Sequence, residues 1–592
     1  MTRTDPQSIF EGNIGILRLR DRELAERLSA QRPDFSAPVH YRFLEARNGD
    51  PVPALTGAAR GADRPLHSLV DPRREGERLI STLDGEDFLI FLGLGAGYHV
   101  EAALKRPETD RIIIVEFGLR GFAELLGLRD LRGVIADRRV WLLVDPLPGT
   151  LEHLIPELYL PALSRAIRTL PLRPRVETAE FDEAANDIRA AIGRITADYS
   201  VQAHFGMRMF KNTLRNLLRA ENSAPPPRIR RAVVCGAGPS LDSQIPRIAE
   251  NRGKAGAPFL IATDTSLPAL LSGGLEPDAV ISIDCQHIGY RHFIPPPNSS
   301  GAVLSRIPLF LDLASPPSLA SLTARPVFFS AGHPLSAYIA ARWRPFPRID
   351  GSGGNVTHAA VSLAETLGAA EIELYGADFS YPLGKTYARG TYIFPYFESR
   401  QNRMEPLEAL FSRFLYRAPL EKRISAAGTW YYETETLTRY RKFLETLGER
   451  MEARLLPAAG LGAPIAGARI VRLPRNAAGP DRAEQTGGLV RKGSAIRGDD
   501  DAAVLPAREF LVRYREQIRG LEVRGSSAGA CLAGLGYEDR QILATLLPLA
   551  AALRRKEPER GDAGIIERTR DYAAGAIDQV LAVRPPAFPR PR

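Results

Sequence analysis

The stretch Ala232-Val-Val-Cys-Gly-Ala-Gly-Pro-Ser-Leu-Asp242 decides the fold of the middle of this 592-residue chain. A short apolar run leads through a glycine-rich turn into a helix, which is the pattern of a strand–turn–helix unit in a parallel sheet. Gly236 and Gly238 allow the tight bend, Pro239 suits a first helical turn, and Ser240 can cap the helix or contact a phosphate. No lysine follows the glycines, so this is not a Walker-type loop.

The same alternation continues on both sides of this turn and predicts two sheets. Short apolar runs at 259–262, 279–283, 327–329 and 371–375 predict further strands, and the spacing over 355–367 predicts a long helix. The amino-terminal part predicts strands at 88–92, 111–115 and 140–144. Apolar strands with helices between them are typical of a parallel sheet covered on both faces.

We therefore predict an α/β protein: two Rossmann-like parallel-sheet domains followed by an all-helical carboxy-terminal region. The predicted parts are an amino-terminal Rossmann-like domain (1–175), a helical connector (176–227), a central domain (228–436) and a helical region (437–592) with a mobile segment at about 458–501.

The amino-acid composition excludes several classes of protein. Apolar residues make up 44% and charged residues 25%, as in ordinary globular proteins, and the three cysteines are too far apart for a zinc finger or a disulfide framework. We expect no signal peptide, no membrane span and a cytoplasmic location. The net charge of +9 favours anionic ligands such as nucleotides, and because no nucleic-acid-binding motif accompanies it, nucleic acid is not the expected partner.

A first glycine-rich turn, Gly93-x-Gly95-x-Gly97, is followed by Glu116 at the end of the next predicted strand. This spacing fits a nucleoside-binding Rossmann half in which Glu116 holds a ribose hydroxyl. It fits equally well a glycine-rich connection that only permits tight packing.

Acidic side chains follow three of the central strands. Thr263-Asp264, Asp284 and Asp378 stand where parallel strands end, and open α/β sheets form their ligand crevices at that edge. An isolated aspartate at a strand end is more often a helix cap. Three such aspartates beside a glycine-rich turn favour a ligand-binding site.

A third glycine-rich loop, with Gly353 and Gly354, runs into the helix that begins at Asn355, so Thr357 and His358 lie in its first turn. His358 taken alone is more often a core or surface histidine than a catalytic one. Downstream lies a stretch rich in hydroxyl and basic groups. Such groups can hold the phosphate that leaves in a transfer reaction, without a metal ion. Its residues are Tyr381, Lys385, Thr386, Tyr387, Arg389, Thr391 and Tyr392.

The segments GAGPSLD, ATDTSLPALLSGGLEPDAVISID and GSGGNVTHAAVSLAETLGAAEIELYGADFSY resemble the motility-associated factor (Maf) flagellin glycosyltransferases. The resemblance is close over about 230–392 and looser in the amino-terminal part. The central domain of that family is similar to the MptE-like 6-hydroxymethylpterin diphosphokinases and, more distantly, to bacterial sialyltransferases.

This resemblance implies inverting transfer of a nonulosonic acid, of the pseudaminic or legionaminic type, from a CMP-sugar to Ser or Thr of flagellin. It assigns Gly236, Gly238, Pro239 and Ser240 to the nucleotide phosphate and Thr263, Asp264 and Asp284 to the cytidine and ribose. Gly353, Gly354, Asn355, Thr357 and Tyr381 complete the donor site, and Asp378, His358 and Tyr387 are the catalytic candidates, with Asp378 or His358 as the base.

The sequence lacks a paired DxD motif, which favours transfer that requires no metal or other cofactor. Asp264 and Asp284 as joint ligands of Mg²⁺ are the alternative. Two other functions stay open: a pterin-type diphosphokinase, which would need Mg²⁺ for ATP, and a flagellin-binding scaffold without catalysis.

Overall fold

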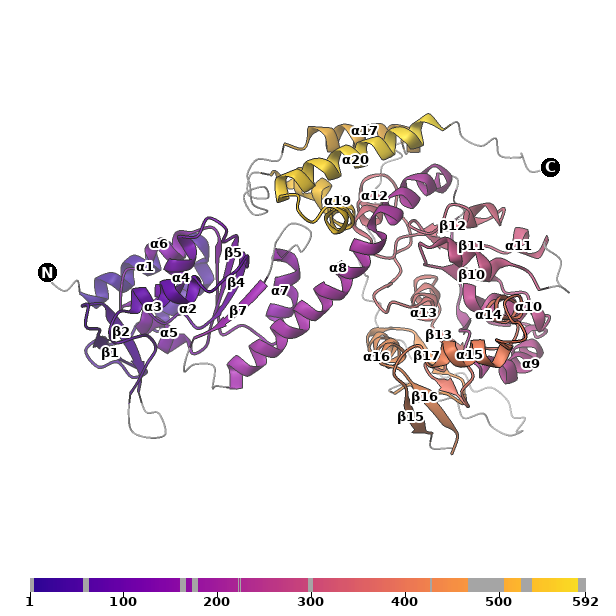
Figure 1. The fold of residues 1–592 in the computed structure, drawn as a ribbon, viewed down its shortest axis with the longest axis horizontal. Helices are drawn as coiled ribbons and strands as arrows, with labels where there is room; N and C mark the ends of the chain where they lie inside the picture. The colour runs from indigo at the N-terminus through magenta and orange to yellow at the C-terminus, as the bar shows by residue number, and fades with distance from the viewer. Residues whose placement is uncertain are drawn as a thin grey trace, which may run out of the picture. The chain divides into compact units, whose positions relative to one another are not determined.

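The computed structural model describes residues 5–56, 63–159, 167–172, 179–221, 223, 225–296, 302–425, 428–466, 505–522 and 535–583. They form two compact units, Met1–Gly206 with Ile518–Tyr572 and Met207–Gln517 with Ala573–Arg592 (Figure 1). Most of the predicted mobile segment, from 467 to 501, lies outside the described residues. Among these, no helix is both long and apolar enough to cross a membrane.

The first unit is built on a four-stranded parallel sheet of order β6-β5-β4-β7. Its strands are β4 (Phe88–Leu92), β5 (Arg111–Glu116), β6 (Val140–Val144) and β7 (Ile167–Pro171), and a separate antiparallel sheet comprises β1 (Tyr41–Glu45), β2 (Pro51–Leu55) and β3 (Arg64–Pro65). Its helices are α1 (Pro6–Arg20), α2 (Arg22–Ala30), α3 (Pro72–Ile80), α4 (Tyr98–Leu104), α5 (Leu119–Leu126), α6 (Arg132–Ala136), α7 (Thr150–Leu158) and α19 (Tyr537–Lys556).

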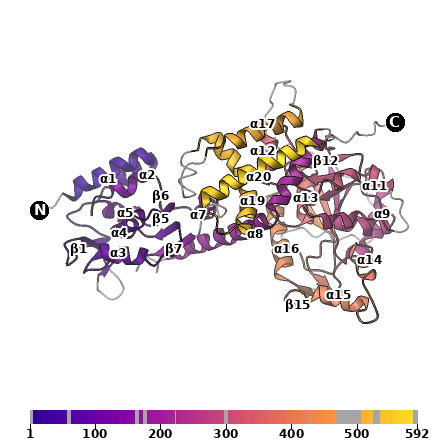
Figure 2. The ribbon, with the colours of Figure 1, turned by 45° about the horizontal axis from the view of Figure 1, so that its top comes forward.

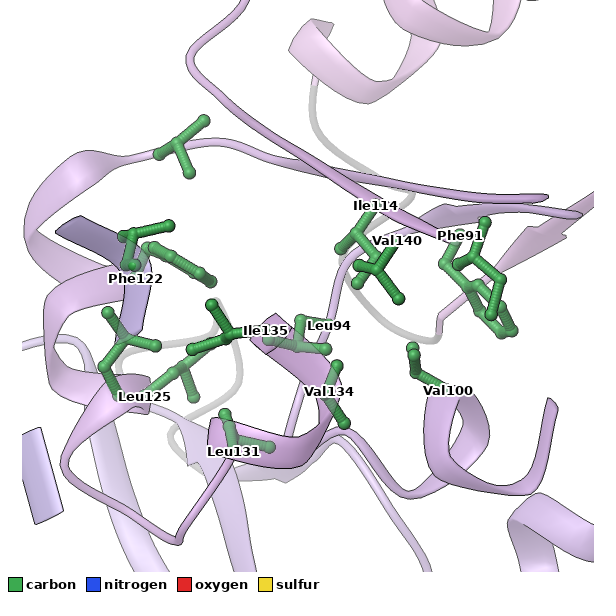
Figure 3. Close-up of a cluster of buried hydrophobic side chains, with 14 of the residues drawn as sticks. Phe91, Leu94, Val100, Ile114, Phe122, Leu125, Leu131, Val134, Ile135 and Val140 are labelled. Carbon is green, nitrogen blue, oxygen red and sulfur yellow. The ribbon is translucent and has the colours of Figure 1, made fainter. Parts of the chain in front are cut away.

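Strand β4 is apolar along its whole length because both faces of its sheet are covered. Leu89 and Phe91 point into the core on one face, whereas Phe88, Ile90 and Leu92 pack against the other cluster. Successive side chains of a strand point to opposite faces, so an unbroken apolar run is what a doubly covered strand requires. Figure 3 shows part of the first core, where Phe91, Ile114 and Val140 lie on the strands and Val100 and Val134 on the covering helices.

Three helices contribute residues to both units: α8 (Ala179–Ala220), α17 (Ala507–Gly520) and α20 (Asp562–Ala582). The second half of α8 is fixed to the sheet of the second unit by two asparagines one turn apart. Asn212 donates to the carbonyls of Cys285 and Ala314, and Asn216 to those of Leu313 and Ser315. The predicted helical connector is thus a single 42-residue helix.

The second unit contains a seven-stranded parallel sheet of order β12-β11-β10-β9-β8-β13-β17. Its strands are β8 (Arg231–Cys235), β9 (Phe259–Thr263), β10 (Ala279–Ser282), β11 (Leu309–Asp312), β12 (Pro326–Phe329), β13 (Glu371–Tyr375) and β17 (Arg454–Pro457). The α-helices are α9 (Leu241–Arg252), α10 (Leu267–Ser272), α11 (Ala302–Arg306), α12 (Pro334–Arg342), α13 (Val356–Thr366), α14 (Ile393–Glu398), α15 (Leu407–Leu415) and α16 (Glu435–Arg450), with short 3-10 turns η2 (Asp264–Ser266), η3 (His287–Phe293) and η4 (Leu319–Ser321).

The strand order of this sheet reverses beside β8. From β8 the chain builds outward through β9 to β12, then returns so that β13 pairs with the other side of β8. Loops that leave two neighbouring strands in opposite directions open a crevice between them, which is where open α/β sheets bind ligands. Here the crevice lies between the turn after β8 and the loop after β13.

The fold class predicted from the sequence is confirmed as α/β with two parallel sheets, but its boundary near residue 437 is wrong. Strand β17 lies within the region predicted to be all helical and pairs with β13 at the edge of the central sheet. A small antiparallel sheet of β14 (Tyr381–Pro382), β16 (Trp430–Glu433) and β15 (Glu421–Ile424) was also not predicted. Helices α14 and α15 contact each other and lie side by side in both views (Figures 1 and 2).

Candidate active site

A cavity of about 390 Å³ lies at the crevice of the central sheet. The turn after β8, the end of β9, the start of α13 and the loop after β13 all contribute to its wall. Eight residues predicted from the sequence line it: Gly238, Thr263, Asn355, Thr357, Asp378, Tyr381, Thr386 and Tyr387. Further lining residues were not among the predicted site residues, and they include Thr265, Arg417, Thr434, Thr436 and Tyr440.

Ser240 and Asp378 join the two loops of the crevice. The carboxylate of Asp378 accepts from the backbone N–H of Ser240 at 2.8 Å and from its hydroxyl at 2.5 Å. The same hydroxyl accepts from the N–H of Leu461 at 2.7 Å, and the N–H of Ala463 donates to the Asp378 carbonyl at 2.9 Å. The segment after β17 therefore closes over this pair, and Asp378 is only 4% exposed.

Three amides of the predicted phosphate cradle at Gly236–Ser240 are bonded within the protein. The N–H of Gly236 donates to the Tyr375 carbonyl and that of Gly238 to the Gly376 carbonyl, each at 2.8 Å. The N–H of Ser240 is taken by Asp378, whose negative charge stands at the place where the phosphate was expected. Pro239 has no N–H to offer. These residues form the predicted turn, but they use it to hold the two strands together.

Backbone strain marks the loop after β13. Phe379 and Leu383 have positive φ values of 42° and 53°, a conformation that costs free energy for residues other than glycine. They stand on either side of the segment that includes Ser380 and Tyr381, and Phe379 lines the cavity. The loop is therefore held in a fixed shape around the cavity, as strained backbone at binding sites often is.

Helix α13 begins at the cavity, as predicted. Asn355 caps it, accepting from the N–H of His358 at 3.0 Å and donating to the Gly353 carbonyl at 3.0 Å. Val356 and Thr357 occupy the first helical turn, where an N–H has no carbonyl one turn earlier to bond. Both residues line the cavity.

His358 lies outside the cavity lining, unlike the prediction that it faces the substrates. Its ring is 2% exposed and packs under the loop before α13, where a side chain at Gly353 would approach the ring to 2.3 Å. Its Nε2 is 3.3 Å from a carboxylate oxygen of Asp350, and burial, opposed by Asp350, lowers its pKa. Gly354 is likewise outside the lining, next to Tyr440.

Asp264 and Asp284 lie at the predicted edge of the sheet but not in the cavity wall. Asp264 is 4% exposed and accepts from Thr265 and from the hydroxyl of Ser282 at 2.7 Å, so it fixes the ends of two strands. Asp284 is half-buried and accepts from the N–H of Gln286 at 2.8 Å. Burial, reinforced by the nearby negative charge of Asp264, raises the pKa of Asp284.

Hydroxyl groups dominate the other side of the cavity. Thr386 is 7% exposed and lines the cavity, and its Oγ1 has no hydrogen-bond partner among the described residues. Burial raises the pKa of Tyr387 to about 12, so this phenol stays protonated and remains a hydrogen-bond donor at neutral pH. Tyr381 belongs to β14 and also reaches the cavity.

Arg417 brings a positive charge to this wall, and sequence reasoning missed it. It follows α15, and its guanidinium lies 3.7 Å from the ring centre of Phe414. Among the described residues it forms no ion pair with a carboxylate. No motif surrounds Arg417 in the sequence, so only the fold, which places the end of α15 at the cavity, identifies it.

The glycine-rich turn of the first unit is filled by the protein's own side chains. Glu116, expected to hold a ribose, instead accepts from the N–H of Leu94 at 2.5 Å and is fully buried. The N–H of Ala96 donates to Nε2 of His67 at 2.9 Å. A Cβ atom on Gly95 would come within 2.4 Å of that nitrogen. Of the two readings of this turn, the structure supports the packing role.

His67, Glu75 and His99 are the one group of three neighbouring metal-type ligands among the described residues. Because Nε2 of His67 accepts a backbone hydrogen bond, the proton of the neutral ring is on Nδ1, which lies 3.6 Å from Glu75. A nitrogen that carries a proton cannot coordinate a metal. Burial, followed by the influence of His67, lowers the pKa of His99 to about 4. We interpret the group as a polar contact between two buried histidines and the partly exposed Glu75.

Comparison with known proteins finds matches that cover the region of the crevice. The family model described as 6-hydroxymethylpterin diphosphokinase MptE-like matches residues 207–384, which include both loops of the crevice. The solved structure of a MAf glycosyltransferase from Magnetospirillum magneticum AMB-1 is similar over 97% of this chain and 95% of that one, with a TM-score of 0.58 and 16% identity. At that identity the similarity shows a shared fold.

Two uncharacterized proteins of Treponema pallidum (strain Nichols) are similar in sequence. One is 40% identical over 116 residues, which span 20% of this chain and 41% of that protein. The other is 35% identical over 173 residues, which span 28% of this chain and 80% of that protein.

Proposed function

We propose that this chain, which belongs to the same family as the second of these Treponema proteins and contains an MptE-like domain, is a glycosyltransferase. The observation that carries the proposal is the cavity at the strand-order reversal of the central sheet, where the turn after β8 and the loop after β13 come from the MptE-like region and further lining residues lie beyond residue 384. Its wall is rich in hydroxyl groups, which suits an activated sugar. The fold shared with the Magnetospirillum MAf glycosyltransferase supports it.

The finer proposal is that the donor is a CMP-nonulosonic acid and the acceptor a Ser or Thr of flagellin, with inversion at the sugar carbon. When the bond from the sugar to the phosphate breaks, negative charge develops on the departing CMP. Donors that are already in place stabilise such charge. Tyr387 and Tyr381 are the phenols that we assign to this role, since both line the cavity.

We assign Asp378 a positioning role. Its carboxylate holds the turn after β8 through two hydrogen bonds with Ser240, so it sets the distance between the two walls of the cavity. His358 acts from outside the cavity by packing under the loop that leads into α13.

The test is incubation of the full chain with a CMP-nonulosonate and purified flagellin. We expect release of CMP together with a mass increase of flagellin by one sugar per modified residue. CMP release without a mass increase would contradict flagellin as the acceptor. Neither product, with a folded protein, would contradict glycosyl transfer from this donor.

The match to the diphosphokinase model favours one second candidate, transfer of a diphosphate from ATP to a pterin-type alcohol. This reaction releases AMP, whereas a CMP-sugar transferase does not. Production of AMP from ATP with Mg²⁺ and 6-hydroxymethylpterin would select the kinase. We favour the transferase because the fold of the Magnetospirillum MAf glycosyltransferase is shared over 97% of this chain, whereas the diphosphokinase model matches residues 207–384.

A further inference from the structure

The anionic group of the donor needs a binding place other than the turn after β8, because that turn presents the carboxylate of Asp378. Polar groups of the cavity that have no partner among the described residues indicate where this group binds. Thr386 is the clearest: it is more than nine-tenths buried, lines the cavity, and its hydroxyl is without a hydrogen bond among the described residues. A buried polar atom that has no partner among the protein's own groups indicates a ligand that supplies the partner.

Two further features converge on the same cavity. The first turn of α13 lines it with Val356 and Thr357, and the amides at the start of a helix attract an anion through the helix dipole. Arg417 adds a full positive charge from the loop after α15, and no carboxylate among the described residues neutralises it. The positive charge of Arg417 opposes the rise that burial causes in the pKa of Tyr387 and Tyr392. Arg417 therefore lies near the hydroxyl groups of the cavity wall.

From this arrangement we infer that Thr386, Arg417 and the first turn of α13 form an oxyanion-binding subsite. The inference rests on the proposed function, and it places the negatively charged group of the donor there. Two groups of a CMP-nonulosonate share this chemistry: the phosphate and the sugar carboxylate. Both accept hydrogen bonds from a guanidinium, a hydroxyl and backbone amides.

The test compares three ligands on the full chain by calorimetry: cytidine, CMP and a free nonulosonic acid. The variants are Arg417→Gln and Thr386→Val, which remove one donor each at nearly constant size. Arg413→Gln is the control, because Arg413 lies on α15, pairs with Glu405 and is outside the cavity lining. Thermal melting of each variant establishes that it is folded.

If the phosphate occupies the subsite, Arg417→Gln weakens CMP binding about 10- to 100-fold and Thr386→Val does so by a smaller factor, while cytidine binding is unchanged. If the sugar carboxylate occupies it, the same variants weaken binding of the free acid and leave CMP unchanged. Equal binding of all three ligands by the Arg417→Gln and control variants would overturn the subsite.

A fourth probe separates this inference from the proposed function. Should wild-type protein bind no cytidine ligand and no nonulosonic acid, the transferase proposal fails, and inorganic pyrophosphate then tests the subsite alone. Pyrophosphate binding that is lost in Arg417→Gln and kept in Arg413→Gln would preserve the oxyanion site. Pyrophosphate binding that is equal in both variants, or absent, would overturn it.

Discussion

The hydroxyl of Ser240 and the carboxylate of Asp378 are 138 residues apart in the sequence and 2.5 Å apart in the structure. This contact joins the turn after β8 to the loop after β13, which are the two sides of the crevice. Both residues are buried. Removing either partner therefore leaves a buried polar group of the other without a hydrogen bond, which lowers the free energy of unfolding.

We expect Asp378→Ala to destabilise the protein, because the N–H and hydroxyl of Ser240 lose their buried acceptor. Each unpaired buried group costs about 1–3 kcal/mol. The free energy of unfolding in urea measures the effect. The control is Ser243→Ala on α9, the helix that follows Ser240; the partly buried hydroxyl of Ser243 donates to the Ser240 carbonyl at 3.0 Å. Equal losses in the two variants would contradict a special role for Asp378.

Gly238→Ala tests the closeness of the two loops. A Cβ atom at this position would come to 2.3 Å from Asp378 Oδ2 and 2.7 Å from the Gly376 carbonyl oxygen, so one of the loops has to move. We expect a lower melting temperature and loss of nucleotide binding. Gly253→Ala at the end of α9 is the matched control, since nothing lies within 4 Å of its added Cβ. A melting temperature that is unchanged in both variants would refute the prediction.

Tyr387→Phe removes a hydroxyl from the cavity and keeps the ring. If the phenol stabilises the departing nucleotide, the rate of CMP release falls about 100- to 1000-fold, as for loss of one preorganised donor. Stability should change little. Tyr396→Phe provides the comparison, because Tyr396 packs in the aromatic cluster of α14 and α15 and is not part of the cavity wall. An unchanged rate in Tyr387→Phe would remove this residue from the mechanism.

Asp312 makes stability depend on pH. It ends β11 and is 6% exposed, and burial, opposed by backbone amides, raises its pKa from 3.8 to about 7. Between these two values the folded state binds the proton and the unfolded state does not. This group therefore contributes stability that is present below pH 4 and is lost, by about 1.4 kcal/mol per pH unit, as the pH rises to about 7.

Asp312→Asn removes that titration. Urea unfolding at several pH values should show a shallower decline of stability between pH 4 and 7 in the variant than in the wild type. Asp284 and Asp378, whose pKa values are also raised, remain in both proteins and cancel in the comparison. Parallel pH profiles would show that Asp312 is ionised in the folded protein throughout this range.

The glycine-rich turn of the first unit should bind no dinucleotide or S-adenosylmethionine, because Glu116 and His67 already accept from its amides. A thermal-shift screen of CMP, CDP, UDP, ATP, NAD and S-adenosylmethionine measures this. A ligand that binds only the folded state raises the melting temperature by mass action. We expect CMP to raise it and NAD and S-adenosylmethionine not to. A shift with either of the latter would assign the first unit a ligand.

The strands that the sequence predicts correctly carry a local pattern, either an unbroken apolar run as in Phe88–Leu92 or an alternation of charged and apolar residues as in Glu371–Tyr375. Phe88–Leu92 and Glu371–Tyr375 were predicted with their observed bounds because each run ends at a turn-forming glycine or a polar residue. Strand β17 was missed because its two leucines follow a long helix and carry no periodic signal. Its pairing with β13 is 83 residues distant, and only tertiary packing selects it.

For the site as well, the sequence predicts where residues lie along the sheet but not which distant residues they contact. Residues at strand ends and helix starts, such as Thr263, Asn355 and Asp378, could be predicted because position in a parallel sheet determines the edge at which they lie. What their groups bond to could not. Spacing along the chain does not reveal that Asp378 fills the turn of Ser240, or that the end of α15 brings Arg417 to the cavity.

The segment recognised by the family model stops at residue 384, whereas the sheet that it belongs to is completed by residues 454–457. A fragment cut at that limit would keep every glycine motif and lose its border strand, leaving β13 with an unsatisfied hydrogen-bonding edge that invites self-association. It would also lose the amides of Leu461 and Ala463 that bond to Ser240 and Asp378. Dissection of this protein into minimal catalytic pieces must therefore retain a distant stretch of chain that motif searches overlook.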